Sequence, residues 1–232
     1  MVCMTCGTDY AEDFGDKIYC FGCGGVAEGY EDKKKDKRDF AKKMYYSDLS
    51  ELDYQKLYSN WRIDKMWANY YGFRIAEYVG SVWLAMPIFD EKGGLLQEVY
   101  RAWNAKCKSK YMGRCAPPPG LVWKSWHDTY TSHYVAIVEG ILDGVYMAQF
   151  LPTIALLGTS FGKEKLDTIK KLCYNSFYAI MLDADGPGIE KAIKLRKELG
   201  LLDTKVIILP FGDPTDYAPA YIENLLIKEG IK

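Results

Sequence analysis

From Tyr134 to the C-terminus, short apolar stretches alternate with longer amphipathic segments. The apolar stretches predict four strands, at 134–139, 153–158, 176–185 and 205–210. The amphipathic segments predict helices at 140–150, 163–173, 188–199 and 221–228. Strands that alternate with helices are joined by right-handed crossovers, which gives a parallel sheet with helices on both faces. We therefore expect residues 134–232 to form an α/β domain around a four-stranded parallel sheet.

Carboxylates follow three of these predicted strands, at the point where each strand ends. They are Glu139, Asp143, Asp183, Asp185, Asp213 and Asp216. The carboxyl ends of parallel strands meet at one edge of a sheet, where α/β proteins bind their ligands. Neighbouring carboxylates repel one another and need a counter-charge, and Mg²⁺ or Mn²⁺ prefers such oxygen ligands. A group of acids without a Ser, Cys or His partner indicates phosphoryl or nucleotidyl transfer that uses two or more metal ions.

Two C-x2-C pairs near the N-terminus, Cys3 with Cys6 and Cys20 with Cys23, are separated by thirteen residues. This spacing lets four thiolates surround one Zn²⁺ ion in a tetrahedron. Because four protein ligands leave no position for water, such an ion would be structural. We expect a zinc ribbon at 1–30, with a fold that depends on one bound Zn²⁺.

Two further regions separate the predicted ribbon from the predicted α/β domain. Residues 31–47 begin with a run of charged residues and are expected to form a linker. Residues 48–133 are expected to form a mixed α+β subdomain. Its aromatic and aliphatic residues recur at helical spacing over 48–71, and two β-forming stretches around a glycine turn predict a hairpin over 82–103.

The densest unmixed positive stretch of the chain begins on the second strand of the predicted hairpin. It comprises Arg101, Lys106, Lys108, Lys110 and Arg114. Solvated surface is the usual interpretation of such a cluster, and contact with nucleotide or template phosphates is the alternative. The net charge of -1 excludes a uniformly basic nucleic-acid binder but not a local basic groove.

The sequence has no apolar run long enough to span a bilayer, and its N-terminus lacks the pattern of a signal peptide. We therefore expect a cytoplasmic protein, located in the host cytoplasm if a phage encodes it.

Four short segments resemble the TOPRIM domain of bacterial and phage-type DNA primases: VEGILD (138–143), LLGTS (156–160), LDADGPG (182–188) and GDPTD (212–216). The chain resembles most the primase half of phage primase-helicases, without the helicase. The resemblance implies that Glu139, Asp143, Asp183, Asp185 and Asp213 are catalytic. It implies that the magnesium ligands are Glu139, Asp183, Asp185, Asp213 and Asp216. Thr215 departs from the family pattern, in which an acid is common at this position.

The resemblance extends upstream, where it implies that Arg101 and Lys110 bind nucleotide or template. The implied activity is that of a DNA primase, a nucleotidyltransferase that synthesises short RNA primers on single-stranded DNA from ribonucleoside triphosphates. A separate replicative helicase is an expected partner, and no membrane is. Two alternatives stay open at this point. The same acids could activate water in a TOPRIM nuclease, or the chain could be a non-catalytic zinc and TOPRIM protein that binds DNA as a recombination mediator.

Overall fold

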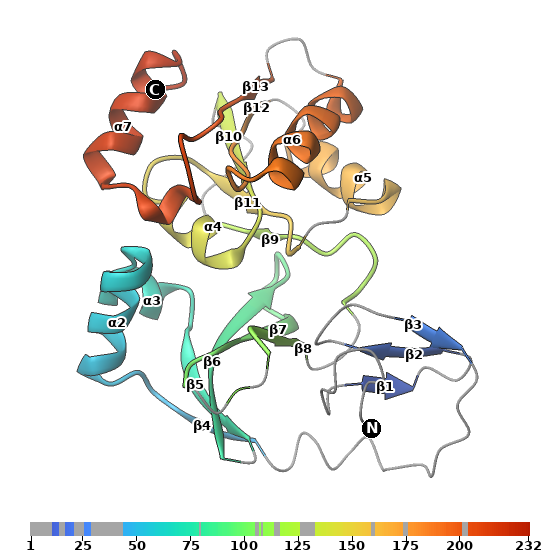
Figure 1. The fold of residues 1–232 in the computed structure, drawn as a ribbon, viewed down its shortest axis with the longest axis vertical. Coiled ribbons are helices and arrows are strands. Elements are labelled where there is room, and N and C mark those ends of the chain that lie inside the picture. The colour runs from blue at the N-terminus through green and yellow to red at the C-terminus, as the bar shows by residue number, and fades with distance from the viewer. Residues whose placement is uncertain are drawn as a thin grey trace. The chain divides into compact units, whose positions relative to one another are not determined.

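The structure is a computed structural model of the chain, shown as a ribbon in Figure 1. It describes residues 44–232 with gaps at 79, 105–106, 108, 114–116, 126–132, 159–160, 174–175 and 201–203, and the backbone of 11–13, 17–20 and 26–28. The chain divides into two compact units, which we call the hairpin unit and the parallel-sheet unit. The hairpin unit comprises 1–51 and 68–117, and the parallel-sheet unit comprises 52–67 and 118–232.

Three short strands lie in the N-terminal segment: β1 (Ala11–Asp13), β2 (Lys17–Cys20) and β3 (Val26–Glu28). They pair in antiparallel fashion in the order β1-β2-β3. The predicted zinc ligands Cys3, Cys6 and Cys23 lie outside the described residues, as does the side chain of Cys20. The zinc ribbon therefore stays a prediction.

The main sheet of the hairpin unit has five antiparallel strands in the order β4-β5-β6-β7-β8. They are β4 (Tyr45–Ser47), β5 (Arg74–Tyr78), β6 (Ser81–Phe89), β7 (Leu95–Ala102) and β8 (Tyr111–Gly113). β6 and β7 confirm the predicted hairpin. In its turn, Oδ1 of Asp90 accepts hydrogen bonds from the backbone N–H groups of Lys92 (2.8 Å) and Gly94 (2.7 Å). Gly93 has a φ of 80°, which a glycine adopts without strain.

The helical pattern over 48–71 forms two helices, α2 (Glu51–Trp61) and α3 (Lys65–Tyr70). The helix breaks at Arg62, which has a left-handed φ of 54°. Asp64 then caps α3 by accepting a hydrogen bond from the backbone N–H of Trp67 at 3.0 Å. Nearly all of α2 belongs to the parallel-sheet unit, whereas the sequence-based division places it in the subdomain at 48–133.

The sheet of the parallel-sheet unit has the order β13-β12-β10-β11-β9. Its strands are β9 (Trp123–Lys124), β10 (Tyr134–Val138), β11 (Thr153–Ala155), β12 (Phe177–Ile180) and β13 (Lys205–Val206). Strands β10 to β13 pair in parallel, as the sequence predicts. β9 adds an antiparallel edge strand that the sequence pattern does not indicate.

Helices follow these strands in the predicted order. They are α4 (Ile141–Met147), α5 (Lys163–Leu172), α6 (Gly186–Leu199), the short 3₁₀ helix η1 (Pro214–Asp216) and α7 (Pro219–Lys228). None of the helices in the described part of the chain is long and apolar enough to cross a membrane.

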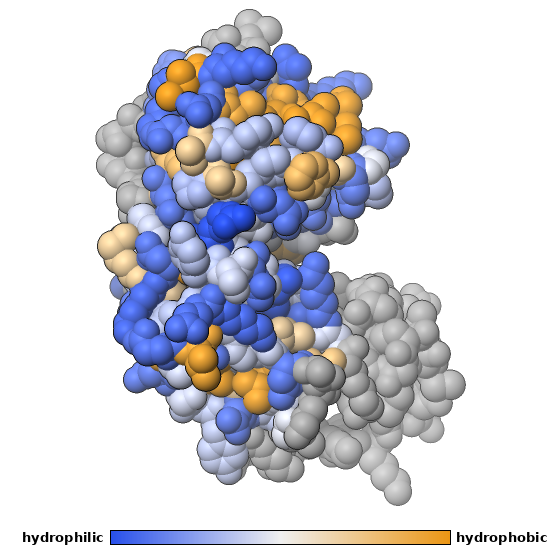
Figure 2. Space-filling view, turned by 60° about the vertical axis from the view of Figure 1, so that its left-hand side comes forward, coloured by the Kyte–Doolittle hydropathy of each residue, from blue (hydrophilic) through white to orange (hydrophobic). Residues whose placement is uncertain are grey.

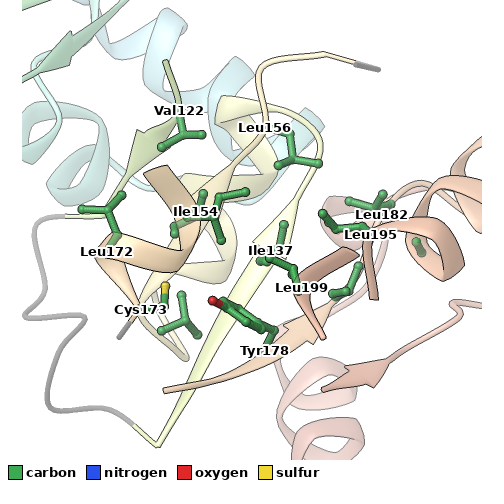
Figure 3. Packing of buried hydrophobic residues seen from close by; sticks show 14 residues of the cluster. Val122, Ile137, Ile154, Leu156, Leu172, Cys173, Tyr178, Leu182, Leu195 and Leu199 are labelled. Atoms are coloured by element: carbon green, nitrogen blue, oxygen red, sulfur yellow. The ribbon is translucent and has the colours of Figure 1, made fainter. Parts of the chain in front are cut away.

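A hydrophobic core fills the space between the parallel sheet and the helices α5 and α6 (Figure 3). Alternate strand residues such as Ile137 and Tyr178 point into it, since side chains of a strand alternate between the two faces. Leu195 and Leu199 of α6 pack against them. Helix α4 packs close to β9 and β11, because Gly144 lies so near the ring of Trp123 that an added Cβ would approach it to 2.7 Å. The core fixes α6 against the strand ends that carry the acids.

Candidate active site

Three chain segments with predicted acids meet at one edge of the parallel sheet. β10 and β13 both pair in parallel with β12, so their carboxyl ends lie on the same side. Glu139 directly follows β10, and Asp183 lies shortly after β12. The loop after β13 is held beside the loop after β12, because the backbone N–H of Ala184 donates to the carbonyl oxygen of Gly212 at 2.7 Å. The backbone therefore brings the acid-bearing loops together.

Asp143 stabilises the first turn of α4. Its Oδ2 accepts a hydrogen bond from the backbone N–H of Gly140 at 3.1 Å, and the side chain is buried. An acid at this position also interacts favourably with the positive end of the helix dipole. Asp143 thus fixes the backbone that immediately follows Glu139.

Asp185 is the N-cap of α6. Its Oδ1 accepts a hydrogen bond from the backbone N–H of Gly188 at 2.6 Å. A Cβ atom on Gly188 would overlap the carbonyl oxygen of Asp183, so only glycine allows the helix to begin this close to the strand end. The DADGPG segment therefore places two carboxylates at the start of a helix that is seated against the sheet.

Asp213 and Asp216 form a capping box around η1. Oδ1 of Asp213 accepts hydrogen bonds from the backbone N–H and the hydroxyl of Thr215, at 2.9 and 2.6 Å. Oδ2 of Asp216 accepts a bond from the backbone N–H of Asp213 at 3.1 Å. Thr215, which departs from the family pattern, is buried and here orients Asp213.

A row of three aromatic rings supports this loop. The ring of Tyr217 stacks on Tyr221, with centroids 4.7 Å apart, and lies 5.1 Å from the ring of Phe211. The hydroxyl of Tyr217 accepts from the backbone N–H of Phe211 (2.9 Å) and donates to its carbonyl oxygen (2.7 Å). Phe211 and Tyr221 are exposed. Figure 2, which brings the α7 side of Figure 1 forward, shows hydrophobic residues among hydrophilic ones on that side.

Lys191 of α6 provides a cation at the strand ends. Its Nζ lies 3.3 and 3.4 Å from the two carboxylate oxygens of Glu139. Both side chains are mostly buried, each with 18% of its surface exposed. The ion pair joins α6 to the carboxyl end of β10.

The predicted nucleotide-binding cations, Arg101 and Lys110, lie in the hairpin unit, where both are close to the ring of Tyr111. Arg101 of β7 donates a hydrogen bond to the hydroxyl of Tyr111, and its guanidinium lies 5.1 Å from the ring centroid. Nζ of Lys110 lies 5.7 Å from the same centroid. Lys110 and Tyr111 are exposed. Two cations around an exposed aromatic ring can contact both the phosphates and the base of a nucleotide.

Solved structures similar to this chain include fragments and domains of primases. The primase fragment of the bacteriophage T7 primase-helicase protein matches with a TM-score of 0.61 and 16% identity, over 100% of this chain and 98% of that one. The chain has a primase fold. The zinc binding and RNA polymerase domains of the Aquifex aeolicus primase match with a TM-score of 0.63 and 14% identity, over 92% of this chain and 72% of that one.

The RNA polymerase domain of the Mycobacterium tuberculosis primase DnaG, in complex with double-stranded DNA, also shares the primase fold. Its TM-score is 0.63 at 18% identity, over 83% of this chain and 77% of that one. No protein-family model and no curated sequence matches the chain. The likeness is therefore one of structure.

The carboxylate oxygens of the predicted acids are suitable ligands for a hard divalent cation. The acids supply only carboxylate oxygens, which Mg²⁺ and Mn²⁺ prefer as ligands. One of these carboxylates, that of Glu139, forms an ion pair with the ammonium group of Lys191. Within the described residues, no three His, Cys, Asp or Glu side chains converge closely enough to hold one ion. Asp185 and Asp213 each direct Oδ1 to a backbone N–H in their helix caps, and a carboxylate has a second oxygen for a metal.

Three residues of this site are not identified from the sequence: Lys191, Tyr146 and Tyr217. Lys191 lies beside the apolar positions of an amphipathic helix, where a lysine ordinarily extends into solvent. Tyr146 of α4 donates its hydroxyl proton to the carbonyl oxygen of Tyr217 at 2.8 Å, across 71 positions of the chain. No local pattern predicts a contact over such a separation.

Proposed function

We propose that the chain is a compact DNA primase of the phage type, which synthesises short RNA primers on single-stranded DNA by metal-dependent nucleotidyl transfer. The observation that carries this proposal is the structural match to the T7 primase fragment over nearly the full length of both chains. Among the similar structures are the primase domains in a complex of the bacteriophage T7 lagging-strand DNA polymerase with an RNA/DNA hybrid and dTTP, and a DnaG catalytic domain bound to single-stranded DNA. Single-stranded DNA is the template expected of a primer-synthesising site.

The acids at the edge of the TOPRIM-type sheet would form the catalytic centre. Bound Mg²⁺ or Mn²⁺, as two or more ions, would neutralise the triphosphate and activate the attacking 3′ hydroxyl. The residues proposed to hold these ions are Glu139, Asp183, Asp185, Asp213 and Asp216. Asp143 would act on Glu139 indirectly, because it fixes the backbone of Gly140 beside it.

The hairpin unit would bind the charged substrates. Arg101 and Lys110 would contact the triphosphate or the template phosphates, and the ring of Tyr111 keeps both cations in place. The zinc ribbon, with Cys3, Cys6, Cys20 and Cys23 around one Zn²⁺, would help to select the start site on the template. A replicative helicase would deliver that template, in the cytoplasm.

Incorporation of labelled ribonucleotides on a panel of single-stranded templates tests this function. We expect short RNA products that require Mg²⁺ or Mn²⁺ and disappear when the metal is chelated. Degradation of DNA in the absence of nucleotides, without any RNA product, would support a nuclease in place of a primase. DNA binding without either reaction would support a recombination mediator.

A further inference from the structure

Lys191 is placed on α6 so that its long side chain reaches back to the strand ends. The buried stripe of α6 consists of Gly188, Ala192, Leu195 and Leu199, and Lys191 lies at its border. Side chains of a helix tilt toward its N-terminus. The N-terminus of α6 lies at Asp185, shortly after the end of β12. The direction of the lysine therefore follows from the seating of α6 on the sheet.

The ion pair with Lys191 uses both carboxylate oxygens of Glu139. Nζ lies 3.3 Å from Oε1 and 3.4 Å from Oε2, so the ammonium group faces the whole carboxylate. With 18% of each side chain exposed, water screens this pair less than an ion pair on the open surface. The charge of Glu139 is thus compensated from within the chain.

A divalent cation bound to Glu139 would use the same carboxylate oxygens. Such a cation would lie close to the ammonium group of Lys191 and would repel it, since like charges in a partly buried site interact strongly. Metal binding at Glu139 and the ion pair with Lys191 therefore compete for the same carboxylate.

We propose that Lys191 is a positioning residue that acts as an internal counter-ion of Glu139, and that a divalent cation must displace its ammonium group to bind. This inference rests on the proposed function to the extent that Glu139 is a metal ligand. If so, Lys191 lowers the affinity of the site for a divalent cation and raises the metal concentration at which the site is occupied. An ion pair that merely joins α6 to β10 would leave metal affinity unchanged when it is removed.

Calorimetric titration of the full chain with Mn²⁺ alone tests the competition. Lys191→Met keeps the length of the side chain and removes its charge, and we expect it to tighten Mn²⁺ binding about fivefold, which corresponds to about 1 kcal/mol. Lys191→Arg keeps the charge and should bind Mn²⁺ about as the native chain does. Lys197→Met, at an exposed position of the same helix, is the matched control and should change nothing. Unchanged or weaker Mn²⁺ binding by Lys191→Met, or no Mn²⁺ binding by the native chain, would overturn the inference.

Reactivity of the lysine amine gives a second readout, independent of any variant. Displacement by Mn²⁺ should release Lys191 toward solvent, so mass spectrometry should show faster acetylation of Lys191 at saturating Mn²⁺ and no change at Lys197. Equal labelling of Lys191 with and without the metal would contradict displacement. Primer synthesis is measured separately, so a chain that makes primers but fails these two tests would lose the role of Lys191 and keep its proposed function.

Discussion

The hydroxyl of Tyr146 on α4 donates a hydrogen bond of 2.8 Å to the carbonyl oxygen of Tyr217, in the loop that follows Asp213 and Asp216. Both side chains are buried, and burial raises the pKa of Tyr146 to about 12, so the hydroxyl keeps the proton that it donates. Since α4 begins just after Glu139, this bond connects two of the acid-bearing segments. A residue outside the acid set thus connects two segments that carry members of that set.

Tyr146→Phe should weaken this connection without creating a cavity. The buried carbonyl oxygen of Tyr217 would lose its donor, and we expect the free energy of unfolding to fall by about 1–2 kcal/mol. Urea denaturation measures this change, and amide exchange should become faster in residues 211–217. Tyr221→Phe removes an exposed hydroxyl of the same aromatic row and should change stability by less than about 0.5 kcal/mol. Equal effects of the two substitutions would show that the Tyr146 bond is unimportant.

Gly188→Ala should disturb the start of α6. The added Cβ would overlap the carbonyl oxygen of Asp183 and press against Oδ1 of Asp185, neither of which can move away freely. We expect a loss of about 2 kcal/mol in unfolding free energy together with weaker Mn²⁺ binding. Gly186→Ala, two residues earlier, is the control because a Cβ there meets nothing within 4 Å. That variant should be neutral or gain up to about 1 kcal/mol, and a loss of similar size in both variants would contradict the proposed close approach.

The elements with a strong hydrophobic period could be predicted from the sequence, and those set by single backbone angles or distant contacts could not. The hairpin of β6 and β7 and the four parallel strands follow from alternating and apolar runs. The helix break at Arg62 has no such signal, because an arginine seldom adopts a positive φ and so does not mark a break in the sequence. The short strand β4 lies in a stretch predicted as linker, since three residues are too few to show a period.

The candidate site divides in the same way. The position of the acids could be predicted because strand ends and carboxylates are both visible in the sequence, and the topology brings their loops to one edge. Their role in catalysis and metal binding stays a prediction. The ion pair of Lys191 with Glu139 spans 52 positions and depends on how α6 packs, which a sequence pattern does not specify. Thr215 was a departure from a family motif in the sequence, and in the structure it is a hydrogen-bond donor to Asp213.

Stability should fall at alkaline pH because of Cys173, which ends α5 and is buried in the core. Burial raises the pKa of its thiol from 9.0 to about 12. Below pH 9.0 the thiol is protonated in both the folded and the unfolded state, so it contributes fully to the stability of the folded state. As the pH rises from 9.0 toward about 12, only the unfolded state releases the proton. Unfolding free energy measured by urea titration should therefore decline across this range. Cys173→Val, which keeps the side chain nearly the same size, should make the decline shallower, and an unchanged slope would contradict the assignment.

Arg101→Ala and Lys110→Ala should each weaken the binding of ribonucleoside triphosphate or template by about tenfold, as expected for the loss of a charged hydrogen bond to phosphate. Fluorescence anisotropy with labelled single-stranded DNA measures the affinity, and the effect should shrink as salt is raised. Tyr111→Leu should weaken binding as well, because both cations lose the ring that positions them. Lys92→Ala, in the exposed hairpin turn, is the charge-matched control. A loss of the same size in Lys92→Ala would mean that only net charge matters.

Primer synthesis by Asp183→Asn and Glu139→Gln, compared with Asp167→Asn on the exposed side of α5, tests the central claim most directly. The two site variants keep the size of the side chain but lose the negative charge that metal binding requires. We expect each to reduce RNA product by at least about 100-fold, since even groups around a metal ligand contribute 10–100-fold, while all three variants stay folded and Asp167→Asn keeps full activity. Undiminished primer synthesis by folded Asp183→Asn and Glu139→Gln would contradict the assignment of catalysis to this edge of the sheet.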